Sequence, residues 1–188
     1  MREVDAIMNK VMKEMINTLL YLLVVLCLTY AVTRFVGQRT KVEGDSMETT
    51  LSDGDNLIVD KITYRFNDPQ RFDIIVFPFQ YQENTFFIKR IIGLPGETVQ
   101  IDYDGTIYID GEVLEENYGR EVIQPEHVGI ANEPITLGEG EYFVLGDNRN
   151  NSSDSRTEVV GNILRDDIIG RAWLRIWPLS EMGILKHQ

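Results

Sequence analysis

The stretch Phe86-Phe87-Ile88-Lys89-Arg90-Ile91-Ile92 is an apolar run that contains two adjacent cations. Large and β-branched apolar residues in a run of this length are typical of a buried β-strand. Because side chains alternate along a strand, Lys89 shares a face with Phe87 and Ile91. The stretch therefore predicts a core strand that holds a lysine between two apolar neighbours.

Short runs of the same kind fill most of the chain from Val42 onward, and Asp-Gly or Pro-Gly pairs separate many of them. We expect further strands at 56–59, 73–77, 99–101, 106–109, 142–145 and 172–177. This pattern predicts a mainly β fold, an antiparallel sheet or barrel-like domain. The acidic segment 113–134 lacks the pattern, and we expect it to be an excursion on the surface.

An apolar run from Met15 to Val36 precedes the β-rich part, without a charged residue between Glu14 and Arg34. About 20 helical residues at 1.5 Å each cross the roughly 30 Å core of a bilayer. A cleaved secretory signal is the alternative, but its apolar region is only about 7–15 residues long. We expect a short N-terminal segment at 1–14, an uncleaved transmembrane helix at 15–36 and the β-rich domain at 37–188.

The composition excludes several classes of function. A length of 188 residues allows one sizeable domain plus an anchor. The net charge of −12 argues against nucleic acid as a partner, because a phosphate backbone needs a basic face. The only cysteine, Cys27, lies in the apolar N-terminal run. This excludes an intrachain disulfide, a thiol-ligated zinc site and a cysteine nucleophile in the β-rich domain.

Lys89 and Ser46 form a candidate catalytic pair. Burial disfavours the ammonium form and can lower a lysine pKa from about 10.4 to about 7–8, so that the neutral amine can deprotonate a serine. Ser46 follows Gly44, which lets the backbone approach a substrate closely. The ordinary alternatives are a surface lysine and a turn serine. Only two histidines, His127 and His187, are available as rival bases, and neither lies in a motif.

The segment Gly146–Arg156 follows an apolar strand and contains no aliphatic side chain. Its two acids, two arginines, amides and hydroxyls suit a buried network in which each polar group has a partner. A disordered polar loop would have a similar composition. In the first case, Ser152 or Ser153 can hold the lysine amine in place, as a third group orients a catalytic base.

Four segments resemble, in order and spacing, the conserved boxes of bacterial type I signal peptidases: Val42–Met47, Arg71–Phe77, Lys89–Glu97 and Gly146–Arg156. The resemblance covers essentially the whole chain, and the single span is similar to the compact Gram-positive form. It implies a membrane-bound serine endopeptidase that removes signal peptides from exported preproteins after a small-x-small sequence. It implies that the protein contacts membrane lipid and is a monomer. It implies neither a metal nor an organic cofactor.

The resemblance also implies roles for individual residues. Ser46 would be the nucleophile, with its amide as an oxyanion donor, and Lys89 the general base. Ser152 would orient the lysine amine. Asp154 and Arg156 would support the site structurally.

Three residues would line the pocket for the small substrate residue before the cut: Met47, Leu51 and Ile88. The chain departs from the family pattern at Thr49, where the family usually has proline, which puts the loop geometry in doubt. At Gly44 one branch of the family has a serine that donates to the oxyanion. Glycine has no hydroxyl, so the second oxyanion donor is unassigned.

Orientation comes from the resemblance alone, since three basic residues lie within a short distance on each side of the span. The resemblance implies the plasma membrane, a cytoplasmic N-terminus and an extracytoplasmic domain. Two rivals are a self-cleaving repressor with the same dyad and a catalytically silent, membrane-tethered paralogue that serves as a binding or assembly domain. The span and the acidic charge argue against the repressor.

Overall fold

The computed structural model describes residues 2–185, and side chains from residue 8 onward. Met1, the first residue of the expected N-terminal segment, and His187 lie outside the described residues. The chain divides into two compact units, one up to Gly37 and one from Gln38.

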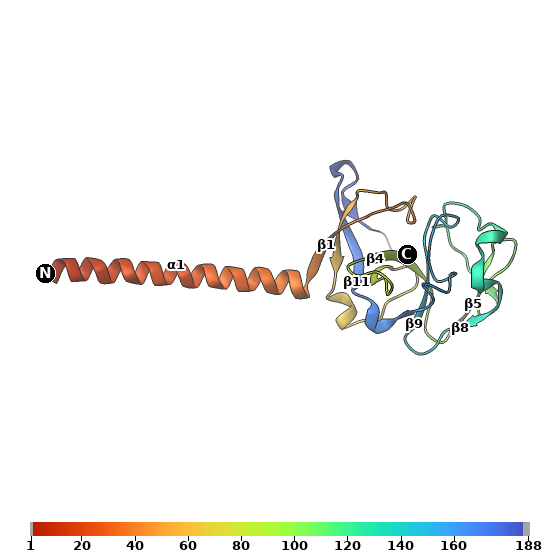
Figure 1. Ribbon diagram of the computed structural model, residues 1–188, viewed down its shortest axis with the longest axis horizontal. Coiled ribbons are helices and arrows are strands. Elements are labelled where there is room, and N and C mark those ends of the chain that lie inside the picture. The colour runs from red at the N-terminus through yellow and green to blue at the C-terminus, as the bar shows by residue number, and fades with distance from the viewer. Residues whose placement is uncertain (1, 186–188) are drawn as a thin grey trace. The chain divides into compact units, whose positions relative to one another are not determined.

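The first unit is the helix α1 (Arg2–Phe35) (Figure 1). Its part from Met8 to Phe35 is long and apolar enough to cross a membrane, with a mean hydropathy of 2.1. The hydroxyl groups of Thr18 and Thr33 donate to carbonyl oxygens one turn earlier in the helix, which satisfies them without water. The helix extends further towards the N-terminus than the expected span at 15–36.

The second unit contains an eight-stranded sheet, in which the pairings with a described register are antiparallel. In spatial order the strands are β1 (Gly37–Lys41), β2 (Asn56–Asp60), β11 (Gly170–Trp177), β3 (Ile74–Pro78), β4 (Phe86–Gly93), β9 (Glu141–Leu145) and β10 (Ile163–Leu164), and β12 (Gly183–Ile184) pairs with β11. The predicted mainly β, antiparallel fold with one N-terminal apolar helix is confirmed.

A smaller antiparallel sheet follows β4. Its strands are, in spatial order, β7 (Glu112–Val113), β6 (Ile107–Ile109), β5 (Thr98–Ile101) and β8 (Ile135–Thr136). In Figure 1, β5 and β8 lie at the end of the domain opposite to β1. Short 3-10 helices complete the described part of the chain: η1 (Thr63–Arg65), η2 (Pro125–His127), η3 (Gly129–Asn132), η4 (Arg165–Asp167) and η5 (Leu179–Glu181).

The large sheet is buried on both faces around β3 and β4. Ile74 and Val76 of β3 belong to one apolar cluster, whereas Ile75 and Phe77, which point the opposite way, belong to another. A strand buried on both sides reads as a continuous apolar run rather than as an alternating one. This explains why the sequence from 73 to 77 has no polar–apolar alternation.

The segment 113–134 is a partial exception to the sequence prediction. It forms little regular structure apart from η2 and η3, as expected for an excursion. Three of its residues, Ile123, Val128 and Ala131, are nevertheless buried with the apolar side chains of the smaller sheet. The prediction of a purely surface excursion is therefore wrong. A single apolar residue every few positions gives no periodic signal, although each contributes to the core.

Candidate active site

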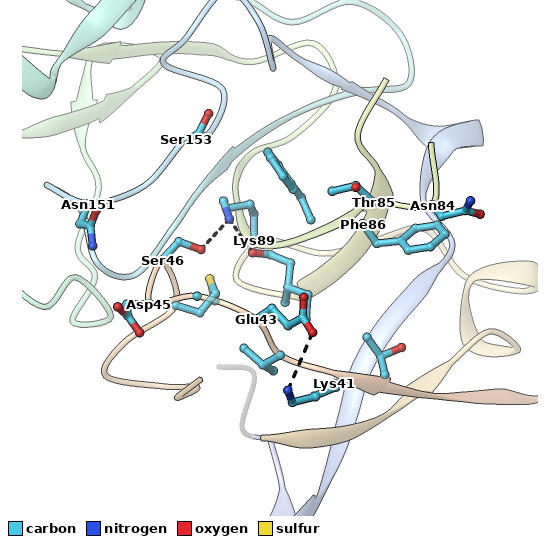
Figure 2. Close-up of a pocket in the computed structure, with 16 residues that line it drawn as sticks. Lys41, Glu43, Asp45, Ser46, Asn84, Thr85, Phe86, Lys89, Asn151 and Ser153 are labelled. Atoms are coloured by element: carbon cyan, nitrogen blue, oxygen red, sulfur yellow. Dashed lines mark hydrogen bonds and ion pairs between the residues drawn. The ribbon is translucent and has the colours of Figure 1, made fainter. Parts of the chain in front are cut away.

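A groove of about 440 Å³ runs between the segment 40–47 and the segment 84–89, and Asn151 and Ser153 lie at its border. Figure 2 shows Ser46 and Lys89 meeting inside it, with Thr85 and Phe86 on one side of the pair and Asp45 and Asn151 on the other. The groove is thus the place where the two predicted catalytic residues come together.

Lys89 lies in β4, where its backbone pairs with Ile75 of β3. Its Nζ is 2.7 Å from Oγ of Ser46 and also donates a hydrogen bond of 3.0 Å to the carbonyl oxygen of Ile88. The side chain of Phe87 places its ring 5.0 Å from this nitrogen. Only 4% of Lys89 is exposed. The lysine is therefore dry, and it is held in place by a neighbouring carbonyl and an aromatic ring.

Burial lowers the pKa of Lys89 from 10.5 to about 8. The negative charges of Asp154 and Asp147 act in the opposite direction, and the positive charge of Arg156 adds to the effect of burial. Desolvation exceeds the attraction of the two carboxylates. About a tenth of Lys89 is then neutral at pH 7, which is enough for a general base.

Ser46 lies in a tight loop that joins β1 to β2. Gly44 has a φ of +90°, a left-handed conformation that favours glycine, and its amide donates to Oδ1 of Asp53. The carbonyl oxygen of Ser46 accepts a 3.0 Å hydrogen bond from the amide of Asn148. Within residues 2–185, no acceptor takes up the Ser46 amide itself. That N–H is available to a substrate oxyanion.

Strand pairing brings the polar segment 146–156 to the lysine. β9 pairs with β4, and Arg90 lies opposite Leu145. Gly146, the first residue of the polar segment, therefore lies next to β4. The guanidinium of Arg90 donates to both carboxylate oxygens of Asp147, at 2.8 and 2.6 Å. Both side chains are fully buried. This bidentate pair joins the catalytic strand to the polar segment.

A second buried pair lies further along the segment. Arg156 donates from Nε and Nη2 to Asp154, both at 2.8 Å, and this carboxylate also accepts hydrogen bonds from the amides of Gly146 at 3.0 Å and Arg156 at 3.3 Å. A Cβ at Gly146 would lie 2.2 Å from Oγ of Ser152 and 2.4 Å from the carbonyl oxygen of Ser46. The polar segment is thus ordered and buried, and glycine lets it approach the nucleophile loop closely.

The sequence model of the family described as "Signal peptidase, peptidase S26" matches residues 15–177. The chain belongs to this family. The match includes Ser46, Lys89 and the whole polar segment. The resemblance noted from the sequence is therefore confirmed.

Relatives in several bacteria bear the same name. The chain is 44% identical to "Signal peptidase I" of Leptolyngbya laminosa, covering 84% of this chain and 77% of the relative. It is 35% identical to "Signal peptidase I T" of Bacillus subtilis (strain 168), covering 93% of each. A crystal structure of a signal peptidase I from Enterococcus faecalis V583 is 39% identical, with a TM-score of 0.46 over 56% of this chain and 97% of that one. The predicted enzyme class, a serine peptidase of the signal peptidase I family, is confirmed.

In this family member, the predicted orienting residue, Ser152, forms no hydrogen bond with the lysine. Oγ of Ser152 is buried and has no hydrogen-bond partner among the described residues. It packs over Gly146, on the nucleophile side of the polar segment. Ser153, the other candidate, is exposed at the border of the groove, and its hydroxyl points away from Lys89 (Figure 2).

The predicted substrate-pocket residues separate into two groups. Met47 and Ile88 line the groove, and both are almost fully buried. Leu51 does not line it, because it is fully buried in the apolar cluster beneath Met47. Thr49, which replaces the usual family proline, is exposed on the loop that follows Ser46.

The structure gives the described histidine no place in the groove. His127 ends η2, and its carbonyl oxygen accepts a 2.9 Å hydrogen bond from Nη1 of Arg156. It therefore supports the polar segment through its backbone alone. Sequence reasoning had no signal for this contact, because a backbone carbonyl carries no residue-type information.

Proposed function

We propose that this protein removes N-terminal signal peptides from exported preproteins, with Ser46 as the nucleophile and Lys89 as the general base. The family and the names of the relatives support the substrate class. The observation that carries the mechanism is the 2.7 Å separation between Nζ of a nearly fully buried lysine and Oγ of the serine.

The reaction follows from this geometry. Neutral Lys89 takes the proton of the Ser46 hydroxyl while Oγ attacks the carbonyl carbon of the scissile peptide bond. The Lys89 ammonium then gives its proton to the leaving amine, and the acyl-enzyme forms. A water molecule that loses a proton to Lys89 hydrolyses the acyl-enzyme and restores the Ser46 hydroxyl. Proton transfers of this kind contribute about 10²–10⁴ in rate.

The Ser46 amide supplies one hydrogen bond to the oxyanion, and such a donor contributes about 10²–10³ in rate. The substrate lies in the groove as an extended strand between the segments 40–44 and 84–88, both of which line it. Met47 and Ile88 contact the small residue before the cut. Their bulk at the floor of the groove leaves little room for a larger side chain.

The other predicted residues have supporting roles in this proposal. Asp154 and Arg156 hold the polar segment in place. Ser152 orients the lysine amine during catalysis in this proposal, and its buried Oγ has no other hydrogen-bond partner among the described residues. No metal or organic cofactor takes part, since the dyad supplies both the nucleophile and the base.

We further propose a single-pass anchor in the plasma membrane. Residues 1–14 lie in the cytoplasm, 15–36 span the bilayer, and 37–188 form the extracytoplasmic catalytic domain. The apolar helix and the family support this arrangement. The protein contacts membrane lipid and the preprotein, acts as a monomer and binds no nucleic acid, in accordance with its net charge of −12.

The test uses full-length protein in detergent and a preprotein with a small-x-small site. We expect one cut after that site, lost in Ser46→Ala and in Lys89→Ala. Ser180→Ala is the matched control, because this serine is exposed in η5. Specific binding of the preprotein without any cleavage would support the silent paralogue and contradict the proposal. Cleavage that survives Lys89→Ala would contradict the dyad alone.

A further inference from the structure

A short segment of the excursion, Glu116–Arg120, contacts both loops of the active site. We call these residues the strap. The strap follows β7 of the smaller sheet and contacts β4, the polar segment and the nucleophile loop. Its position beside two catalytic loops raises the question of what it contributes to them.

The first contact covers Arg90, the residue next to the catalytic lysine. The ring centroid of Tyr118 lies 3.6 Å from the guanidinium carbon of Arg90, and Phe72 lies 5.1 Å from the Tyr118 ring. The guanidinium is fully buried and donates in its own plane to Asp147 and to the carbonyl oxygen of Phe72. Its faces carry no hydrogen-bonding groups, and the tyrosine ring covers one of them.

Three further contacts join the strap to the polar segment and the nucleophile loop. The Arg120 amide donates to the carbonyl oxygen of Asp147 at 2.8 Å, and its Nη1 pairs with Glu48 of the nucleophile loop at 2.8 Å. Glu116 forms an ion pair with the buried Arg149 at 2.7 Å and accepts a hydrogen bond from the amide of Tyr118. The strap therefore holds the ring of Tyr118 over Arg90 from both ends.

We propose that Tyr118 is a positioning residue of the active site, which keeps the Arg90–Asp147 pair dry and in place beside Lys89. The proposal rests on the proposed function. Tyr118 does not touch the substrate or the reacting atoms. It acts through Arg90, whose backbone neighbour is the base.

The physical basis is the response of a buried ion pair to water. A cation against a ring face is attracted most strongly where both are desolvated. Without the ring, water reaches the guanidinium and the pair with Asp147 loosens. More of the Asp147 charge then acts on Lys89, which favours its ammonium form.

Two other charges act on the lysine besides Asp147, and Asp147 itself is paired with Arg90. Asp154 favours the ammonium, while Arg156 disfavours it, and the two are bound to each other on the polar segment. The cation of Arg90 lies one residue away and offsets Asp147. Loss of Tyr118 leaves the Asp154–Arg156 pair intact and weakens only the Arg90–Asp147 pair. This change makes Lys89 harder to deprotonate.

The experiment measures kcat/KM for preprotein cleavage against pH in full-length Tyr118→Leu and Tyr118→Phe. Leucine fills much of the space but has no π face, whereas phenylalanine keeps the ring. We expect Tyr118→Leu to lower kcat/KM at pH 7 by roughly two- to thirtyfold, the range that cation–π contacts span from exposed to desolvated sites. The acid limb of its pH–rate profile should shift to higher pH by at least about half a unit. In Tyr118→Phe, both kcat/KM at pH 7 and the position of the acid limb should stay at their wild-type values. Tyr103→Leu, at an exposed tyrosine, is the matched control.

A second readout does not depend on cleavage. In lysine-labelled protein, the ¹³Cε shift of Lys89 reports its protonation, and Lys89→Met assigns the signal. We expect the midpoint of the Lys89 titration to lie at a higher pH in Tyr118→Leu than in wild type. In Tyr118→Phe it should be unchanged. An unchanged midpoint with lower activity at every pH would overturn the proposal and leave a purely structural role. If the wild-type protein cleaves nothing, the NMR comparison still decides the role of Tyr118, and only the proposed function fails.

Discussion

Nζ of Lys89 and Oγ of Ser46 lie 2.7 Å apart, although the two residues are 43 positions apart in the sequence. The lysine comes from the centre of the large sheet, and the serine from a loop between β1 and β2. Because the strand is rigid and the amine is dry, the base is held ready before substrate arrives. Several measurable consequences arise from this one contact.

The rate of cleavage should rise with pH through the pKa of Lys89, about 8. The neutral amine is the active form, so kcat/KM increases about tenfold per pH unit below 7 and levels off above about 9. The measurement is kcat/KM for a preprotein peptide between pH 5.5 and 10. A profile that stays flat across this range would show that a lysine with a lowered pKa is not the base.

Replacing Lys89 with methionine should stabilise the protein while abolishing activity. The unfolded state binds a proton that the folded state has lost between pH 8 and 10.5, so wild-type stability rises with pH in that window. At pH 7 the buried ammonium is a cost, and Lys89→Met removes it, raising the free energy of unfolding by about 1–3 kcal/mol.

Urea unfolding of the full-length variant, followed by tryptophan fluorescence at pH 7 and at pH 10, checks this prediction. The increase in unfolding free energy that Lys89→Met gives should be smaller at pH 10, because less of the cost of burying Lys89 remains in the wild-type protein there. Lys61→Met, at a partly exposed lysine on the surface, serves as the control. A variant less stable than wild type at pH 7 would mean that the lysine hydrogen bonds outweigh its desolvation.

Gly146→Ala should impair the site without abolishing the fold. Its Cβ would lie 2.4 Å from the carbonyl oxygen of Ser46 and 2.2 Å from Oγ of Ser152, so one of the two loops must move. Overpacking of this kind costs about 1–3 kcal/mol, and a displaced nucleophile loses up to about 100-fold in rate. Steady-state cleavage and thermal unfolding measure the two effects. Gly183→Ala, where a Cβ meets nothing within 4 Å, should change neither.

Ser152→Ala separates two roles for a buried hydroxyl. Its Oγ has no partner among the described residues, so its removal should leave stability unchanged or raise it slightly. If the hydroxyl orients Lys89 during catalysis, kcat falls by roughly 10–100-fold while the unfolding midpoint stays. Ser153→Ala, at the border of the groove, should lower kcat far less. Equal losses in the two variants would argue against the orienting role.

Much of the fold could be predicted from local patterns. The strands expected at 56–59, 73–77 and 86–92 appear within one or two residues of these positions, because β-branched runs between turn residues have few alternatives. The burial of residues in the segment 113–134 could not be predicted from local patterns. Its buried residues are isolated along the chain, so their burial depends on neighbours that the local sequence does not specify.

Part of the candidate site could likewise be predicted, through the residue types and order of the boxes around Ser46, Lys89 and Gly146. The strap had no such signal. Tyr118 is one aromatic residue in an acidic stretch, and only the folded chain places it over Arg90. The same holds for Leu51, whose side chain lies beneath the groove rather than in it.

By itself, the sequence determined an apolar helix, a β-rich domain and the membership of a peptidase family, since these depend on patterns of neighbouring residues. The tertiary structure decided whether the amine is dry, which hydroxyl it meets and which side chains surround it. Burial and distance arise from strands and loops far apart in the chain, as when β9 pairs with β4 and carries Asp147 to Arg90. No local pattern contains that information.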